Sequence, residues 1–390
     1  MRFDAGQQFN FLPIPTDIHF GYGSSRTLPD HVRSRKARRV FVVTDPGVRA
    51  AGILDAVTST LERAGIDLTI YDRVTPDSGS SLIREAVDEL KTSGADLVVG
   101  VGGGSSLDTA KAVAALATNP GSPLDYVGLH KVQNQSLPTI AIPTTAGTGS
   151  EVSLWSVFTD DDRRLKVAIG GVLLYPTMAL CDPELTMGLP PALTASTGMD
   201  GLAHAVECYT NTACQPISAA LALGAIELIG GHLRRAVVDG QDRHARYAML
   251  LASTMAGMAM NPTRLGLAHA LAMPLGSWDL RIPHSVAIAV TLPVVMRFNC
   301  SAAPERFIAV ARALGERVDD CPPAEGAVRA AAAVERLARA IRIPETLSEH
   351  GLRAEHVDDV VEEAMKSGNV AVNPRPTSKE ELTEILRRVL

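Results

Sequence analysis

The sequence predicts an α/β protein in two parts: an N-terminal domain built on a parallel β-sheet, residues 1–189, and an all-helical domain, residues 190–390. Two observations predict this organisation. Short β-branched runs alternate with helical patterns in the first half, and such runs nearly vanish after about Pro191, where Ala- and Leu-rich segments take over. With 390 residues, the chain is also too long for one ordinary core and fits two domains.

We expect four buried strands in the first half. They cover residues 39–44, 67–71, 96–101 and 139–142. Helical spacing follows the first three of them, at residues 54–64, 80–93 and 105 to about 116. Strands that alternate with helices imply right-handed crossovers, and therefore a parallel sheet with helices on both faces.

The second half is expected to be helical throughout. Its clearest segments are residues 217–238, 242–260, 324–341 and 354–366. Residue pairs that contain proline separate such segments: Asn261-Pro262, Pro322-Pro323 and Asn373-Pro374. Proline cannot donate the N–H that continues a helix, so we expect these pairs to lie at helix boundaries.

Composition and charge narrow the class of protein. Hydrophobic residues make up 46% of the chain and charged residues 21%, which is typical of a soluble globular protein. The net charge is −6 and no basic stripe is present, which argues against a nucleic-acid partner. The five cysteines form no CxxC pair, and neither a signal peptide nor an apolar run of roughly 18 residues is found. We therefore expect a reduced, cytoplasmic protein that does not bind membranes.

A glycine-rich turn follows the third expected strand. Residues 101–111 read VGGGSSLDTAK and run from a strand into a helix. Glycines let the backbone approach a ligand closely, and a helix start offers free N–H groups and the positive end of its dipole to a phosphate. The spacing is neither GxGxxG nor a P-loop. The turn either binds a phosphate or simply connects strand to helix, and its three glycines favour phosphate binding.

A second glycine-rich turn follows the fourth strand, at residues 143–151 with the sequence PTTAGTGSE. Ligands of parallel sheets bind at the carboxyl ends of the strands, so both turns belong at one edge of the sheet. Together they favour a dinucleotide over either turn alone. Asp45, just past the first of these strands, either meets a ribose hydroxyl or serves as a turn residue before Pro46-Gly47.

A candidate metal site lies in the helical half. Asp200 and His204 are four residues apart in a helical segment, so their side chains project from one face. A carboxylate with an imidazole suits Fe²⁺, Zn²⁺ or Mn²⁺, although such a pair is more often solvated or capping. His269 and His284 follow in apolar segments, where a single histidine is usually a core residue. Taken together, three histidines and one aspartate have the composition that a Lewis-acid site requires.

At these residues the sequence resembles the iron-containing (group III) alcohol dehydrogenase family, which is related in fold to glycerol dehydrogenase and dehydroquinate synthase. The motifs that carry the resemblance are HFGYG (19–23), GGGSSLDTAK (102–111), PTTAGTGSE (143–151), Lys166, DPEL (182–185), GMDGLAHAVE (198–207), LAHALAMPLG (267–276) and IPH (282–284). They cover essentially the whole chain in the expected order. The resemblance implies an N-terminal Rossmann-like domain, an all-α C-terminal domain, and a cleft between them for cofactor and metal.

The resemblance also assigns roles to individual residues. It makes Asp200, His204, His269 and His284 the metal ligands and the catalytic centre, with Fe²⁺ as the expected ion and Zn²⁺ as the alternative. The residues that it implies for the cofactor are Asp45 at the adenosine ribose, Gly103, Gly104 and Ser105 at the pyrophosphate, Asp108, Thr144, Thr145 and Thr148 along the cofactor, and Lys166 on its ribose side. The expected cofactor is NAD(H), with NADP(H) as the alternative, and the expected assembly is a homodimer.

The activity that follows is hydride transfer between NAD(H) and a small alcohol, aldehyde or ketone, with the metal as a Lewis acid. Two alternatives stay open. One is a maleylacetate reductase-like oxidoreductase, and the retained Asp200 argues against it. The other is a dehydroquinate synthase-like lyase, which would regenerate NAD within each turnover. A non-catalytic metal- and nucleotide-binding protein is disfavoured by the complete ligand set.

One position departs from the family pattern. Members commonly carry a second histidine four residues after the third metal ligand, and here that position is Met273. A thioether cannot carry a proton, so we expect the usual proton relay to be missing and Met273 to shape the substrate pocket. Trp155 and Trp278 either narrow the same pocket or belong to the core.

Overall fold

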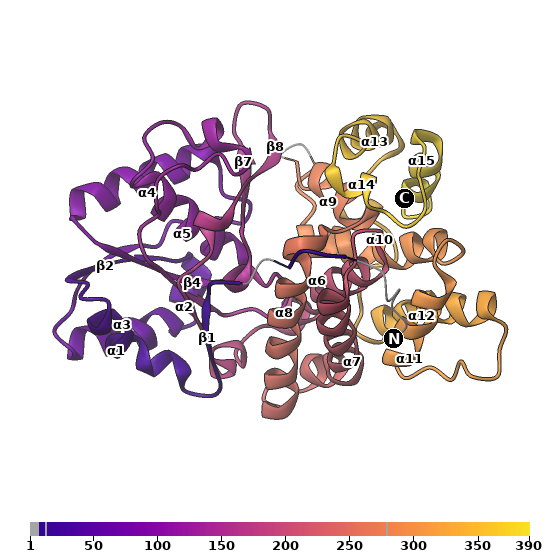
Figure 1. Cartoon of the computed structure of the whole chain (residues 1–390), viewed down its shortest axis with the longest axis horizontal. Helices are drawn as coiled ribbons and strands as arrows, with labels where there is room; N and C mark the ends of the chain where they lie inside the picture. Colours follow the sequence, from indigo (N-terminus) through magenta and orange to yellow (C-terminus); the bar gives the residue numbers. More distant parts are fainter. Residues whose placement is uncertain (1–7, 12–13, 278–279) are drawn as a thin grey trace. The chain divides into compact units, whose positions relative to one another are not determined.

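The computed structural model describes residues 8–11, 14–277 and 280–390. The chain forms two compact units (Figure 1). The sheet unit contains Ile14–Thr145 and Gly149–Leu189. The helical unit contains Pro190–Leu390, together with Ala146–Thr148 and the described residues before Ile14. The chain therefore changes unit between Leu189 and Pro190, and the loop of residues 144–149 contributes to both units.

The sheet unit is built on a parallel six-stranded sheet in the order β1-β9-β6-β4-β2-β3. Its strands are β1 (Asp17–Phe20), β2 (Arg39–Val43), β3 (Asp67–Tyr71), β4 (Leu97–Gly102), β6 (Thr139–Pro143) and β9 (Met178–Cys181). Four of these strands match the expected ones within two residues at each end. β1 and β9, which are four residues each, were not expected from the sequence.

Helices cover both faces of this sheet. They are α1 (Leu28–Ser34), α2 (Pro46–Ala50), α3 (Ile53–Arg63), α4 (Ser80–Ser93) and α5 (Gly104–Leu116). Alternate residues of β2 point to opposite faces, as the two-residue period of a strand requires. Val40 and Val42 pack with α1 and α3, whereas Phe41 and Val43 pack with α4 and α5. The expected parallel sheet between two helical layers is confirmed.

A second, three-stranded sheet was not expected from the sequence. It consists of β5 (Gly128–Leu129), β7 (Trp155–Asp160) and β8 (Leu165–Gly170), in the order β5-β8-β7, with β7 and β8 antiparallel. The turn between β7 and β8 is tied to α4 through Asp161, whose carboxylate accepts hydrogen bonds from the Ser81 N–H and the Ser80 hydroxyl. This ribbon is thereby anchored to the main sheet's helical layer.

The helical unit holds ten helices within the residues described. They are α6 (Pro191–Thr210), α7 (Pro216–Val238), α8 (Arg243–Thr263), α9 (Leu267–Leu275), α10 (His284–Asn299), α11 (Pro304–Ala313), α12 (Pro323–Ala340), α13 (Val357–Ala364), α14 (Gly368–Ala371) and α15 (Lys379–Arg387). One hydrophobic core runs through them. α6 is buried along almost its whole length, and Arg306 of α11 donates to the carbonyls of Tyr209 and Asn211 at its C-terminal end.

One expected helix boundary was wrong. We expected α8 to end before Asn261-Pro262, but it continues to Thr263 with Pro262 inside its last turn. Proline lacks the N–H that would bond to a carbonyl one turn earlier, but at Pro262 only one further helical residue follows, so the loss of this hydrogen bond does not end the helix sooner. The helix instead ends at Arg264, whose φ of 60° turns the chain out of the helical path toward α9.

Among the described residues, α7 alone is long and apolar enough by composition to cross a membrane, with a mean hydropathy of 1.4 over its best window. It packs against α6 and α8, and Ala222, Ile226 and Leu233 lie in the common core. One face of α7 is therefore buried in the helical unit, and 39% of the apolar window is buried.

Candidate functional site

Three strands of the main sheet end at one edge, and the predicted cofactor residues follow them. β2 pairs with β4 so that Val43 lies opposite Gly100, and β4 pairs with β6 so that Gly102 lies opposite Pro143. Asp45, the triple glycine and Thr144-Thr145 therefore all follow the carboxyl ends of neighbouring strands. This is the edge at which parallel sheets bind their ligands.

The backbone at Gly102 can be formed only by glycine. Its φ of 150° is in the region that L-residues avoid, and an added Cβ would lie 2.5 Å from the Ser106 Oγ and 3.0 Å from the Asp45 Oδ2. Gly103 then acts as the N-cap of α5, and no side chain caps this helix end. The first N–H groups of α5 are thus left to a ligand, which is the arrangement that binds phosphates at helix starts.

Asp45 has the turn role considered for it from the sequence, and its carboxylate is also held beside the glycine-rich turn. Its Oδ1 accepts a hydrogen bond from the Val48 N–H at 3.0 Å and caps α2, as a turn residue does. Its Oδ2 accepts a hydrogen bond from the Ser106 hydroxyl at 2.8 Å, which holds the carboxylate beside the glycine turn. The side chain is half-buried and its position is fixed from both oxygens.

Two other predicted cofactor residues are engaged within the protein. The Asp108 carboxylate pairs with the Lys111 ammonium at 2.9 Å and accepts hydrogen bonds from the Ser150 hydroxyl and the Val157 N–H. Lys111, only 1% exposed, also donates to the Ser150 carbonyl. Asp108 and Lys111 therefore hold the second glycine-rich loop against α5. Lys166 is similarly engaged, with its ammonium 2.5 Å from the Asp77 Oδ1.

The threonines of the second turn are divided between the units. Thr144 is buried and its N–H donates to the Gly102 carbonyl, so it links the two glycine-rich turns. Thr145 lies beside Gly103, because a Cβ added there would be 3.3 Å from the Thr145 side chain. Thr148 belongs to the helical unit.

The helical unit brings three of the four predicted metal ligands, Asp200, His269 and His284, into one group, and His204 lies beside this group. Asp200 and His204 come from one face of α6, His269 from α9, and His284 is the first residue of α10. Candidate ligand atoms of Asp200, His269 and His284 lie within 4.8 Å of one another. The His269 Nε2 is 3.6 Å from the Asp200 Oδ1. Two ligands about 2.1 Å from one tetrahedral ion would be roughly 3.4 Å apart, so this spacing suits a shared metal.

His204 is oriented by the backbone. Its ring centroid is 4.5 Å from that of His269, and its Nδ1 is 3.2 Å from the Gly147 carbonyl oxygen. A carbonyl only accepts, so Nδ1 carries the proton and Nε2 is left as the nitrogen that can bind a metal. Gly147 cannot be replaced without moving this carbonyl, because a Cβ would lie 2.4 Å from the Thr197 oxygen.

Burial and unpaired polar atoms support a metal at this place. Asp200 is 1% exposed and His269 4%. Within the described part of the chain, the Asp200 Oδ1 and the His269 Nε2 have no hydrogen-bond partner. Buried polar atoms without partners are rare in proteins and costly. A divalent cation would satisfy both atoms, and the donor set of one carboxylate and three imidazoles fits Fe²⁺ or Zn²⁺.

The ionisation of these groups is strongly coupled. Burial alone would raise the pKa of Asp200, but the neighbouring His204, His269 and His284 hold it well below its ordinary value. Burial likewise lowers the pKa of His204 despite the Asp200 carboxylate. For His269 the carboxylates of Glu207 and Asp200 outweigh burial and raise the pKa to about 9. Opposite charges are therefore concentrated in a small, dry space.

Glu207 is a site residue that the sequence reasoning missed. It lies three residues after His204 and seven after Asp200, so α6 presents all three side chains on one face. Its carboxylate is 2.6 Å from the His269 Nδ1. The signal was present in the spacing of the GMDGLAHAVE motif, but a glutamate on a helix has too many ordinary explanations to be selected from spacing alone.

Met273 is the partly exposed member of an otherwise buried helix. It lies one turn after His269 on α9, and the other residues of that helix are buried. It is absent from the described side chains that pack on the helical core. Trp155 covers Gly170 in the second sheet, where a Cβ would lie 2.3 Å from its ring. Trp278 lies outside the described residues.

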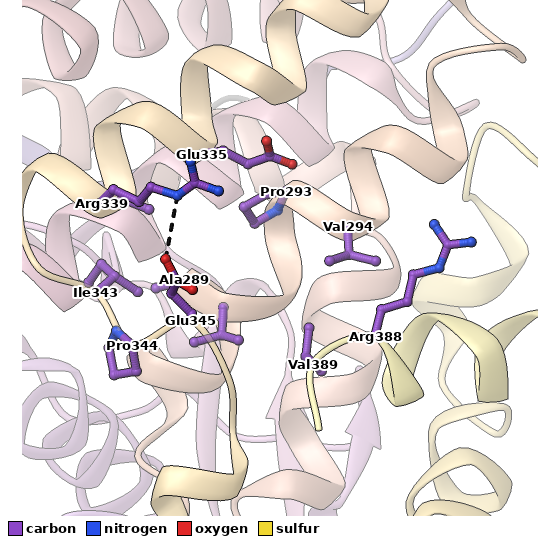
Figure 2. Close-up of a pocket in the computed structure, with 12 residues that line it drawn as sticks. Ala289, Pro293, Val294, Glu335, Arg339, Ile343, Pro344, Glu345, Arg388 and Val389 are labelled. Atoms are coloured by element: carbon purple, nitrogen blue, oxygen red, sulfur yellow. Dashed lines mark ion pairs between the residues drawn. The ribbon is translucent and has the colours of Figure 1, made fainter.

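A separate cavity of about 240 Å³ occurs in the helical unit, between α10, α12 and α15 (Figure 2). Pro293, Val294 and Ile343 form part of its apolar wall. The charged side chains at its rim pair with other residues, as Arg339 does with Glu345 at 3.6 Å. The described lining contributes no buried polar atom without a partner, in contrast to the histidine cluster.

Comparisons with known proteins identify the family and the fold. The family described as "Iron-containing alcohol dehydrogenase" matches residues 15–183, and "Fe-containing alcohol dehydrogenase family, C-terminal" matches residues 194–390. The chain is 37% identical to a choline dehydrogenase of Bacillus subtilis (strain 168), over 100% of this chain and 97% of the relative. It is 35% identical to the NAD-dependent methanol dehydrogenase of Bacillus methanolicus, over 98% and 100%. The structure of a 1,3-propanediol oxidoreductase superposes with a TM-score of 0.95 at 36% identity, over 98% of this chain and 100% of the other.

A sheet edge suited to a dinucleotide and a buried carboxylate–histidine cluster are the features of a metal-dependent oxidoreductase class. The chain belongs to the iron-containing alcohol dehydrogenase family. Its function is that of an alcohol dehydrogenase or aldehyde reductase.

Proposed function

We propose that the chain interconverts a small primary alcohol and its aldehyde with NAD(H), at a metal centre held by Asp200, His204, His269 and His284. The observation that carries this proposal is the buried cluster in which the Asp200 Oδ1 and the His269 Nε2 lie 3.6 Å apart without other partners. Family membership supports iron and NAD. Fe²⁺ is our first choice of metal, and Zn²⁺ suits the same donors.

The four ligand residues and Glu207 prepare the metal centre before any substrate binds. The Gly147 carbonyl fixes the tautomer of His204, and the Glu207 carboxylate accepts a hydrogen bond from the Nδ1–H of His269. When bound, the metal supplies a Lewis acid for the substrate oxygen, and the nicotinamide supplies or accepts the hydride. The surrounding buried helices exclude water, which strengthens the electrostatic interactions inside the site.

For the cofactor, we propose that the open N–H groups of Gly103, Gly104 and Ser105 bind the pyrophosphate. Thr144, Thr145 and Thr148 would line the cofactor, and Lys166 would reach its ribose side after exchanging its Asp77 partner. Asp45 would accept a hydrogen bond from the adenosine ribose. We propose Asp108 as a residue that positions the second glycine-rich loop, because both its oxygens are already engaged within the sheet unit.

The proposed substrate class comes from chemistry that the relatives share. Choline, methanol and 1,3-propanediol all carry a primary hydroxyl group. A dehydroquinate synthase-like reaction would regenerate NAD in each turnover, and maleylacetate reduction requires an acidic substrate. The family match and the assembled Asp200 favour alcohol oxidation and aldehyde reduction over both alternatives.

A substrate screen tests this function directly. The purified chain, reconstituted with Fe²⁺ or with Zn²⁺, is assayed at 340 nm with primary alcohols and NAD⁺, and with aldehydes and NADH. We expect primary alcohols and their aldehydes to turn over and 2-oxoacids to be poor substrates. Consumption of an enol-ketone acid alone, or product formation without a net change in NADH, would overturn the proposal.

Met273→His tests the role of the residue that departs from the family pattern. Met273 is partly exposed one turn after His269, so we propose that it lines the substrate pocket. Histidine there introduces a group with an ordinary pKa of about 6.5. We expect the variant to keep its metal and to gain a pH dependence of kcat between about pH 6 and 7. A pH–rate profile equal to the parent's, together with a lowered melting temperature, would place Met273 in the core instead.

We also propose a cytoplasmic, homodimeric protein. Cys208, Cys214, Cys300 and Cys321 form no disulfide and three of them are buried, which suits a reducing compartment. Light scattering of the purified chain distinguishes a dimer from a monomer, and a monomer at micromolar concentration would contradict this expectation.

A further inference from the structure

The carboxylate of Glu207 makes three polar contacts with the start of α9. The side chain is 4% exposed. Its Oε2 accepts a hydrogen bond from the Gly266 N–H at 2.8 Å, and its Oε1 accepts one from the Ala268 N–H at 2.7 Å. Oε2 also accepts a hydrogen bond from the His269 Nδ1–H at 2.6 Å. All three donors lie at the start of α9, so one side chain of α6 binds both the backbone and the histidine of the neighbouring helix.

These contacts determine which nitrogen of His269 can bind a metal. An ionised carboxylate only accepts hydrogen bonds, so Nδ1 must carry a proton. With Nδ1 held by Glu207, the ring is oriented so that Nε2 faces Asp200, and it lies 3.6 Å from the Asp200 Oδ1. Because Asp200 and Glu207 both belong to α6, the same helix supplies one ligand and orients another.

We propose that Glu207 is a positioning residue that sets the metal affinity of the site by fixing the tautomer and ring orientation of His269. This inference rests on the proposed metal centre. Partners of this kind typically contribute about 10- to 100-fold in metal affinity when a carboxylate holds a ligating histidine. Glu207 itself would contact neither the metal nor the substrate.

Gly266 gives an independent way to move this carboxylate. An alanine Cβ at Gly266 would have Oε1, Cδ and Cγ of Glu207 as its three nearest atoms, at 2.8, 2.9 and 3.2 Å. The φ of Gly266 is −141°, which alanine adopts without strain. Gly266→Ala should therefore push the Glu207 side chain away while leaving Glu207 and His269 in the sequence.

The first experiment measures Co²⁺ binding to the metal-free chain, from the absorption spectrum of the ion in competition with a chelator. Glu207→Gln keeps the shape of the side chain. Both oxygens of Glu207 accept hydrogen bonds from N–H groups, so the NH₂ group of glutamine would place a donor against a donor and lose at least one of these bonds. We expect Co²⁺ to bind 10- to 100-fold more weakly, with an altered spectrum. Asp242→Asn is the matched control, because Asp242 also accepts from a helix start, at the Ala245 N–H of α8. We expect it to bind Co²⁺ like the parent.

The outcomes of this experiment are distinct. Parent-like affinity in Glu207→Gln, or an equal loss in Asp242→Asn, would overturn the role of Glu207 while leaving the metal centre in place. A parent chain that binds no Co²⁺, Zn²⁺ or Fe²⁺ would overturn the proposed function itself. Melting temperatures of the metal-free variants separate loss of affinity from loss of folding.

The second experiment is a double-mutant cycle. Gly266→Ala should weaken Co²⁺ binding several-fold in the parent, because the carboxylate is displaced. In a Glu207→Ala background the same substitution meets no carboxylate, so it should have no further effect. If Gly266→Ala weakens binding equally in both backgrounds, its effect does not act through Glu207 and the inference is overturned.

Discussion

His269→Ala is expected to lower bound metal severely and to reduce kcat at least about 1000-fold. The substitution removes a ligand whose Nε2 lies 3.6 Å from the Asp200 Oδ1. Loss of Lewis-acid stabilisation of several kcal/mol corresponds to a rate factor of about 10³ or more. Metal content by atomic emission and kcat with NAD⁺ and a primary alcohol are the two measurements.

This variant should also lose stability, which the sequence did not suggest. Alanine leaves the carboxylates of Asp200 and Glu207 without the imidazole that separates them. Removing one member of a buried charged group typically costs about 3–5 kcal/mol. The assay must therefore be run below the melting temperature of the variant, with folding checked by circular dichroism.

His232→Ala is the matched control, because this histidine bonds the Leu228 carbonyl on α7 and takes no part in the cluster. It should keep full metal content and kcat. If His269→Ala retains both as well, His269 is an ordinary core histidine and the metal centre is wrongly assigned.

The second large effect is expected at Asp45. A carboxylate at the adenosine ribose would repel the 2′-phosphate of NADP(H) by about 1–4 kcal/mol, depending on the local dielectric. We therefore expect kcat/KM for NAD(H) to exceed that for NADP(H) by about 10- to 1000-fold. Asp45→Asn should remove most of this preference.

Asparagine is the informative substitution because Asp45 also has structural contacts. Its Oδ1 caps α2 through the Val48 N–H, and asparagine caps helices as well as aspartate does. Asp45→Gly would remove the cap and the Ser106 contact together with the charge. Asp55→Asn, an exposed change of the same charge in the first turn of α3, is the control. An unchanged cofactor preference in Asp45→Asn would remove Asp45 from the ribose site.

The expectations that succeeded rest on local signals. The continuous apolar run of β2 and the glycines that end β4 are properties of short sequence segments. The i, i+4 spacing of Asp200 and His204 likewise needs only a helix to place both on one face. β1, β9 and the β7–β8 ribbon were missed because their sequences, DIHF, MALC, WSVFTD and LKVAIG, lack the short β-branched run followed by helical spacing that marked most of the expected strands.

Other features depended on contacts between distant residues. The resemblance implied Asp108 as a cofactor residue, and only the structure shows that its carboxylate also contacts Lys111, Ser150 and Val157. Glu207 could not be distinguished from any other helical glutamate until the start of α9 was placed beside it. Hydrogen-bond partners separated by 40 to 60 residues leave no periodic trace in a sequence.

The sequence by itself determined the class of fold, the two glycine-rich turns and the four candidate ligands, because each depends on residue type and local spacing. The tertiary structure decided which atoms are left without partners. It showed that the Asp45 carboxylate is held at both oxygens, that Met273 is partly exposed on an otherwise buried helix, and that the Glu207 carboxylate lies 2.6 Å from the His269 Nδ1. These properties depend on burial and on the direction of hydrogen bonds, which arise only when helices far apart in the chain pack together.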